Sequence, residues 1–279
     1  MGNNKFITFL ILILPFSFFY SCSTENEEHE FYMHSNGITV MCPDTSPGDL
    51  GTVDGIEYES VDRELLLLYR DGNIDLRRVC TSTITDMSDL FRGFDFNIPI
   101  ESWDVSNVTD MGWMFANSNF NQPLEAWNVS NVTNMKRMFA NTPFNRQLEG
   151  WDVSNVTDMS DMFWQTTFNK NIENWNVSNV TNMAGMFHSS KFNQALNKWD
   201  VSSVTDMLAM FQESSFNQPI GGWDVSNVND MRQMFWNSLF DQPINNWCVT
   251  NITSEPIYFS TGSLLSNENM PVWGTCPSN

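Results

Sequence analysis

The chain has 279 residues, and its formal net charge is −20, from 33 acidic and 13 basic residues with no basic run. A surface of this sign repels nucleic acid, because phosphate binding requires clustered Lys and Arg, so we expect no nucleic-acid partner. Aromatic residues make up 14% of the chain and apolar residues 41%, which excludes a disordered protein.

The N-terminus is typical of an export signal. Lys5 precedes an apolar run, residues 6–19, that is too short to span a bilayer as a stable helix, and Ser21 is small. Cys22 follows at once, as in a bacterial lipoprotein signal that is cut before a lipid-modified cysteine. We therefore expect a lipoprotein signal peptide at 1–21 and lipidation of Cys22. A plain signal peptide with an incidental cysteine is the alternative.

An acidic tether and a small cap are expected to follow the signal. Residues 22–38 are polar and acidic, which favours a tether, and residues 39–82 resemble a cap that covers the end of a repeat array. Asp54-Gly55 predicts the turn of a hairpin. The stretch "DRELLLLYR" predicts a short helix that ends at Asp71-Gly72.

Five cysteines in an exported chain leave four for disulfides if lipid modifies Cys22. Cys42 and Cys80 precede the repeats, whereas Cys248 and Cys276 follow them. Four cysteines allow three pairings, and local pairing within each flank is the simplest. We therefore expect Cys42–Cys80 and Cys248–Cys276 in an oxidising location.

A repeat of 24 residues organises the rest of the chain. The stretch "WDVSNVTDM" at 151–159 returns with small changes, and Trp recurs without insertion at 103, 127, 151, 175, 199, 223 and 247. With Trp as position 1, Val stands at 3 and 6, Met at 9 and 12, and Phe at 13 and 18. Six complete units span 103–246, so we expect an array at 83–252 and a C-terminal cap at 253–279. A fixed period of this length predicts a solenoid.

The letters of one unit predict an α/β coil. Ile or Leu at position 22, with Trp at 1 and Val at 3, predicts a short parallel strand. The apolar spacing from position 6 to position 13 predicts a short helix, and "FNQP" at 18–21 predicts a turn. The Met and aromatic columns recur in every coil, as a core requires and a cofactor site does not, so we expect no cofactor.

Positions 2 and 8 both read Asp, Asn, Asp, Asn, Asp, Asp in successive units. Stacked carboxylates repel one another, and an Asn between two Asp relieves this repulsion and is expected to donate hydrogen bonds to both. A calcium ladder is the alternative, because oxygen ligands suit that ion. The Asn residues and the missing Gly-x-Asp loop favour the ladder without metal.

Variable columns are the place to look for binding. Positions 11 and 14 change from coil to coil and carry Trp113, Trp164, His188 and Trp236. Aromatic side chains beside polar groups suit a protein or glycan partner. Filling of local gaps is the alternative. Few histidines and no nucleophile, phosphate-loop or metal spacing argue against an enzyme, such as a polysaccharide-active one.

The motif "WDVSNVTDMxxMF…FNQPI" resembles the BspA-like leucine-rich-repeat surface lipoproteins of Bacteroidetes over about residues 84–276. The resemblance implies a right-handed leucine-rich-repeat-like solenoid, anchoring in the outer membrane with display at the cell surface, and binding or adhesion. The acidic segment after Cys22 is similar to the signal that sends such lipoproteins to the outer face. A structural envelope protein without a specific ligand is the alternative function.

Overall fold

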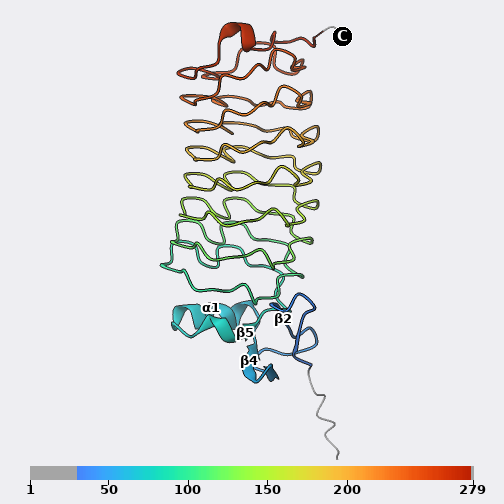
Figure 1. The fold of residues 1–279 in the computed structure, drawn as a ribbon, viewed down its shortest axis with the longest axis vertical. Helices are drawn as coiled ribbons and strands as arrows, with labels where there is room; N and C mark the ends of the chain where they lie inside the picture. The colour runs from blue at the N-terminus through green and yellow to red at the C-terminus, as the bar shows by residue number, and fades with distance from the viewer. Residues whose placement is uncertain (1–29, 278–279) are drawn as a thin grey trace, which may run out of the picture.

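The computed structural model describes residues 30–277, which form a small cap and a tall stack of coils (Figure 1). The cap contains two small sheets. Antiparallel pairs join β1 (Tyr32–Met33) to β2 (Val40–Met41) and β3 (Leu50–Val53) to β4 (Ile56–Ser60). The helix α1 (Arg63–Asp71) and the 3-10 turn η1 (Leu76–Arg78) connect β4 to β5 (Val79–Cys80), which lies parallel to β4.

Local signals in the cap were predicted correctly. The hairpin β3–β4 turns at Asp54 and Gly55, whose φ angles are 52° and 78°. The carboxylate of Asp62 accepts the backbone N–H of Leu65 at 2.8 Å and so caps the start of α1. Gly72 ends that helix, as expected.

The predicted tether at 22–38 is too long at its C-terminal end. The hairpin β1–β2 already starts at Tyr32, and Phe31 packs on the core of the cap. Gly51 makes room for it, because a Cβ at that position would lie 2.1 Å from the Phe31 ring. The signal peptide at 1–21 and Cys22 lie outside the described residues.

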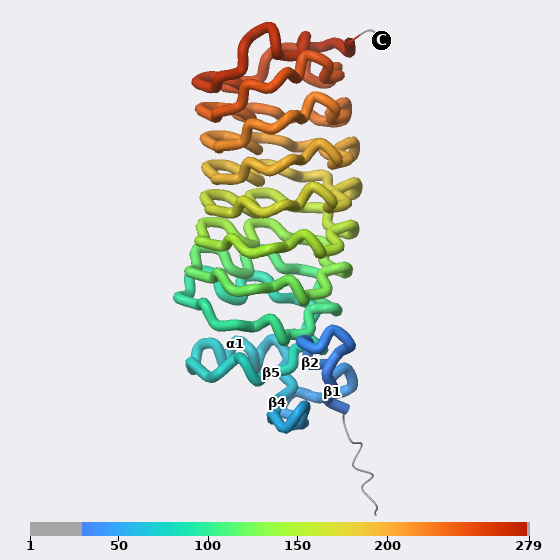
Figure 2. Tube along the Cα trace, in the orientation of Figure 1, coloured from blue at the N-terminus to red at the C-terminus, as the bar shows by residue number. Residues whose placement is uncertain are grey.

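Coils stack along one axis through a parallel backbone ladder (Figure 2). Backbone N–H groups at positions 9, 11, 13 and 15 donate to carbonyls at positions 8, 10, 12 and 14 of the next coil. In one coil these bonds are Met111 to Asn134 at 2.9 Å, Trp113 to Lys136 at 2.7 Å, Phe115 to Met138 at 3.0 Å and Asn117 to Ala140 at 2.8 Å. Parallel bridges join position 8 from Asp86 to Asp230. The ladder is therefore not at the Trp-x-Val stretch, where the sequence predicted the strand.

No coil between residues 84 and 252 contains the expected helix. Positions 9–16 form successive turns instead, closed by bonds such as Met114 N–H to Met111 O at 3.2 Å and Ser118 N–H to Phe115 O at 3.1 Å. Positions 11 and 15 adopt left-handed φ values, for example 61° at Trp113. A left-handed residue interrupts a right-handed helix and frees alternate N–H groups for the neighbouring coil.

The core consists of columns of identical side chains, as predicted. Phe115 and Phe139 stack with ring centres 5.7 Å apart, and Trp151 and Trp175 with centres 6.5 Å apart. The indole Nε1–H of each core Trp donates to the backbone carbonyl 27 residues earlier in the chain, at 3.0 Å from Trp151 to Leu124. Each coil thus completes the core of its neighbour, which no single coil could bury alone.

A polar seam runs beside the core. Asn131 Nδ2–H donates to the carbonyl of Ser106 at 2.7 Å, and the equivalent bond recurs in most coils. At position 8, Asn134 Nδ2 lies 3.0 Å from both carboxylate oxygens of Asp110. The Asn residues of this column donate to the Asp of the preceding coil, whereas the predicted bonds to the Asp on both sides are not formed in the described part of the chain.

The C-terminal cap continues the stack before closing it. Gln233 N–H donates to Ile257 O at 3.0 Å and Phe235 N–H to Phe259 O at 2.8 Å, so the ladder passes the predicted boundary at 252. The rings of Phe235 and Phe259 meet edge-on at 89°, which ends the parallel column. The 3-10 turn η2 (Asn267–Asn269) follows.

Both predicted disulfides, Cys42–Cys80 and Cys248–Cys276, are present. The first ties the two small sheets of the N-terminal cap together, and the second holds the tail against the last coil. No helix among residues 30–277 is long and apolar enough to cross a bilayer.

Candidate binding face

Side chains at positions 11 and 14 form what we call the variable face. They project from the turns of the ladder segment. Trp113, Trp164, His188 and Trp236 are each half-buried, so none is the fully exposed aromatic that a free binding platform would present.

Two contacts on this face run diagonally between neighbouring coils. Position 14 of one coil touches position 11 of the next: the guanidinium carbon of Arg92 lies 3.9 Å from the ring centre of Trp113. Trp236 stacks in the same way on Tyr258, with ring centres 5.5 Å apart. Tyr258 occupies position 11 of the last coil because one extra residue shifts the register there, as the bond from Gln233 to Ile257 shows.

Five residues form a continuous row over the N-terminal half of the array. We call this row the Arg–Trp strip: Arg92, Trp113, Arg137, Trp164 and His188. Arg137 lies 4.3 Å from the ring centre of Trp113 and 5.5 Å from that of Trp164, whose ring is 6.1 Å from His188. Three of the four predicted residues are therefore brought together, whereas Trp236 lies further along the stack with Tyr258.

Two arginines that the sequence analysis did not select as site residues stack on predicted tryptophans. Arg92 and Arg137 both approach the ring of Trp113, so its aromatic surface is engaged by two cations. The binding role predicted for Trp113 stays a prediction, because these contacts do not test it. The strip offers guanidinium N–H donors, and the stacking on Trp113 fixes the orientation of both guanidinium groups. A sequence signal existed, because Arg92 and Arg137 occupy the same two variable columns.

An ion pair fixes the middle of the strip. Arg137 Nε lies 2.8 Å from Asp161 Oδ2, and the two side chains are 31% and 21% exposed. Gly185 makes space for that carboxylate, because a Cβ there would lie 2.1 Å from Asp161 Oδ1. The ion pair uses one edge of the guanidinium group and holds the group over the tryptophans.

Trp164 and His188 form the C-terminal end of the strip. The Nε1–H of Trp164 is buried and has no acceptor among the described residues. Burial lowers the pKa of His188, and this effect outweighs the opposing influence of Glu213 and Asp161. His188 is therefore neutral at neutral pH, so the cationic part of the strip is confined to the arginines.

Metal-binding groups do not gather on this face. Among residues 30–277, no three or more His, Cys, Asp or Glu side chains are placed to hold an ion. At position 8, the Oδ1 atoms instead accept backbone N–H groups two residues further on, at 2.7 Å from Gly112 to Asp110.

These features define a repeat protein whose coils share one core and differ along one face. The chain belongs to the family described as "Mycoplasma protein of unknown function, DUF285", which matches residues 68–167 and again 164–273. The two matches together cover the array and most of the C-terminal cap. No curated protein and no solved structure was found to match the chain.

Proposed function

We propose that the protein is a surface-anchored bacterial lipoprotein that acts as a binding or adhesion module for an extracellular protein or glycan. In this proposal the stack is a right-handed leucine-rich-repeat-like solenoid of the BspA-like type. Lipid on Cys22 holds it in the outer membrane, and the variable face meets the partner.

The Arg–Trp strip is the observation that carries the proposal. The neighbouring columns repeat the same residues in every coil and so offer a uniform surface. The strip breaks this uniformity with two arginines whose guanidinium groups are already oriented by Trp113. Donors that are held in place before binding lose little entropy when a ligand arrives.

The guanidinium groups of the Arg–Trp strip indicate the chemical class of the ligand. Guanidinium groups recognise carboxylates and other oxygen-rich groups through paired hydrogen bonds. The strip runs along the axis, so an extended partner with spaced acidic or hydroxyl groups fits it best. An acidic glycan and an acidic peptide segment are the two forms of such a partner.

A binding screen tests the proposal. Full-length protein in detergent is screened against acidic and neutral glycans and against extracellular-matrix proteins, and hits are compared between Arg137→Ala and Arg146→Ala. Arg146 is an exposed arginine of the same coil on another face, and its side chain donates to the carbonyl of Asn121. We expect Arg137→Ala to weaken binding by about 2 kcal/mol, as at an interface anchor, and Arg146→Ala to leave it unchanged.

Equal loss in both variants, or no ligand at all, would favour the structural envelope protein instead. Anchoring is tested separately. Cys22→Ser should release the protein from membranes, because lipid chains supply the attachment. A variant that stays in the membrane fraction would contradict the lipoprotein assignment.

A further inference from the structure

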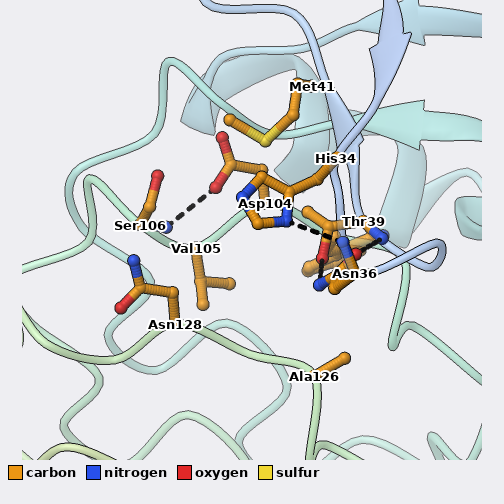
Figure 3. A pocket seen from close by; sticks show the side chains of 10 residues that line it. His34, Asn36, Thr39, Met41, Asp104, Val105, Ser106, Ala126 and Asn128 are labelled. Atoms are coloured by element: carbon orange, nitrogen blue, oxygen red, sulfur yellow. Dashed lines mark hydrogen bonds between the residues drawn. The ribbon is translucent and has the colours of Figure 1, made fainter.

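A pocket of about 190 Å³ lies where the N-terminal cap meets the first complete coil (Figure 3). The hairpin β1–β2 supplies His34, Asn36, Thr39 and Met41. Coil residues Trp103–Ser106, Ala126 and Asn128 supply the rest of the lining. This volume is far larger than the ~10–15 Å³ that one water molecule requires.

Asp104 is a buried carboxylate in this pocket, only 3% exposed. Its Oδ1 accepts the backbone N–H of Ser106 at 3.0 Å. Its Oδ2 is buried and has no hydrogen-bond partner, and no ion pair joins Asp104 to a cationic side chain within residues 30–277. A buried carboxylate is stable only when paired or fully hydrogen-bonded, so this oxygen lacks a donor.

The cap makes this carboxylate different from its counterparts. The other position-2 residues of the complete units are Asn128, Asp152, Asn176, Asp200 and Asp224, and all are exposed. They make the same turn, as in the bond from Ser154 N–H to Asp152 Oδ1 at 3.0 Å. Asn128 also lines the pocket but is exposed, so Asp104 is the one residue of these six that the docked hairpin β1–β2 buries.

Several bonds hold the roof of the pocket in place. Val40 N–H donates to the carbonyl of Ser102 at 2.9 Å, and Thr81 Oγ1–H donates to the carbonyl of Asp104 at 2.8 Å. Asn36 Nδ2–H donates to Thr39 Oγ1 at 2.9 Å and Asn36 Oδ1 accepts two backbone N–H groups, which shapes the hairpin. The site is therefore formed before any ligand binds.

We propose that this pocket binds a primary ammonium group carried on a short aliphatic chain, with Asp104 Oδ2 as its counter-ion. The ammonium supplies the missing donor and the missing charge in one group. Met41, Val105 and Ala126 line the apolar part of the pocket, which suits the methylene chain. The net charge of −20 raises the local concentration of cations around the protein. The proposal does not depend on the variable face.

Charge selectivity is tested on the wild-type chain without any substitution. Isothermal titration of the full-length protein uses n-butylamine, its neutral counterpart 1-butanol, and Nα-acetyl-lysine methylamide. We expect saturable binding of ammonium compounds and none of 1-butanol. If the lysine compound binds and n-butylamine does not, the natural ligand is a lysine side chain of a partner protein. If both compounds bind, free amines are ligands as well.

Matched substitutions then locate the site. Asp104→Asn should weaken ammonium binding at least about tenfold, because a charge-assisted bond is lost. Asp152→Asn makes the same change at an exposed copy of the position and should have no effect. Asn occurs naturally at position 2 in Asn128 and Asn176, so both variants are compatible with the coil. Equal affinity in the two variants, equal binding of 1-butanol and n-butylamine, or no binding of any ammonium compound would overturn the proposal.

Discussion

Tryptophans in this chain have two different environments. Trp151 is 4% exposed and its indole N–H is hydrogen-bonded to Leu124, whereas Trp164 is half-buried and its N–H has no acceptor in the described part of the chain. The first belongs to the shared core and the second to the Arg–Trp strip.

Substitution by alanine should separate these environments. Trp151→Ala removes a core ring and its hydrogen bond, so we expect the free energy of unfolding to fall by about 3–5 kcal/mol. Trp164→Ala should cost about 1 kcal/mol, within the ordinary range for a partly exposed site. Urea denaturation measures both. An equally large loss for Trp164→Ala would make this residue part of the core and remove it from the candidate face.

Left-handed residues are a second feature at this scale. Gln165 at position 15 has a φ of 53° and is exposed, and the equivalent residue of an earlier coil is Gly93, with a φ of 74°. Non-glycine side chains in this region meet the backbone, and β-branched ones do so most severely.

Two substitutions at Gln165 should therefore act in opposite directions. Gln165→Gly should raise the free energy of unfolding by up to about 1 kcal/mol. Glycine relieves the left-handed strain, and this gain slightly exceeds the extra conformational entropy that glycine loses on folding. Gln165→Val should lower it by about 1–2 kcal/mol. Thermal melts of the two variants give the comparison, and a stabilising valine would refute the assigned backbone geometry.

At the scale of elements, the core columns were predictable from the sequence and the backbone ladder was not. Trp, Met and Phe recur every 24 residues, so their shared burial follows from the repeat. The spacing of Met and Phe fits a helix and also a series of turns, and burial alone does not distinguish the two. The distinguishing feature is left-handed φ at positions 11 and 15, where residues as different as Trp113, Arg137 and Gly185 occur.

The variable face was predicted only in part from the sequence. Listing the variable columns identified Trp113, Trp164 and His188. Arg92 reaches Trp113 diagonally, from position 14 of one coil to position 11 of the next, and Arg137 lies in the same column as Trp113, one coil further on. Both were missed because the prediction selected aromatic and histidine side chains and did not consider the cations that stack on them. Tyr258 was missed because the extra residue in the last coil breaks the 24-residue register.

The C-terminal cap gives a prediction at the scale of elements. The bridge Cys248–Cys276 closes a loop with a sequence separation of 28, which the chain-entropy model values at about 3–4 kcal/mol. A Cys248→Ser, Cys276→Ser variant should lose hydrogen-exchange protection in the last coil and keep it near Cys42, because coils contact only their neighbours. Loss of protection throughout the array would contradict this local role.

For the whole molecule, the exact repeat predicts that coils are removable. Deleting residues 199–222 joins Lys198 to Trp223 in phase and leaves the Arg–Trp strip complete. We expect a folded protein with an unchanged circular dichroism spectrum per residue and a lower urea midpoint, since one interface between coils is lost. Deleting residues 199–210 breaks the phase and should prevent cooperative folding. A folded half-coil deletion would show that the 24-residue register is not required.

The direction of the ladder has a mechanical consequence. The N-terminal cap and the C-terminal cap lie at opposite ends of the stack (Figure 2), and the backbone hydrogen bonds between coils run along the line that joins them. A force applied to the two ends therefore acts on every coil in series, and the weakest interface between neighbouring coils separates first. Under tension the chain would therefore yield in steps of one coil and lengthen, so the stack would respond as an extensible element and not as a rigid rod.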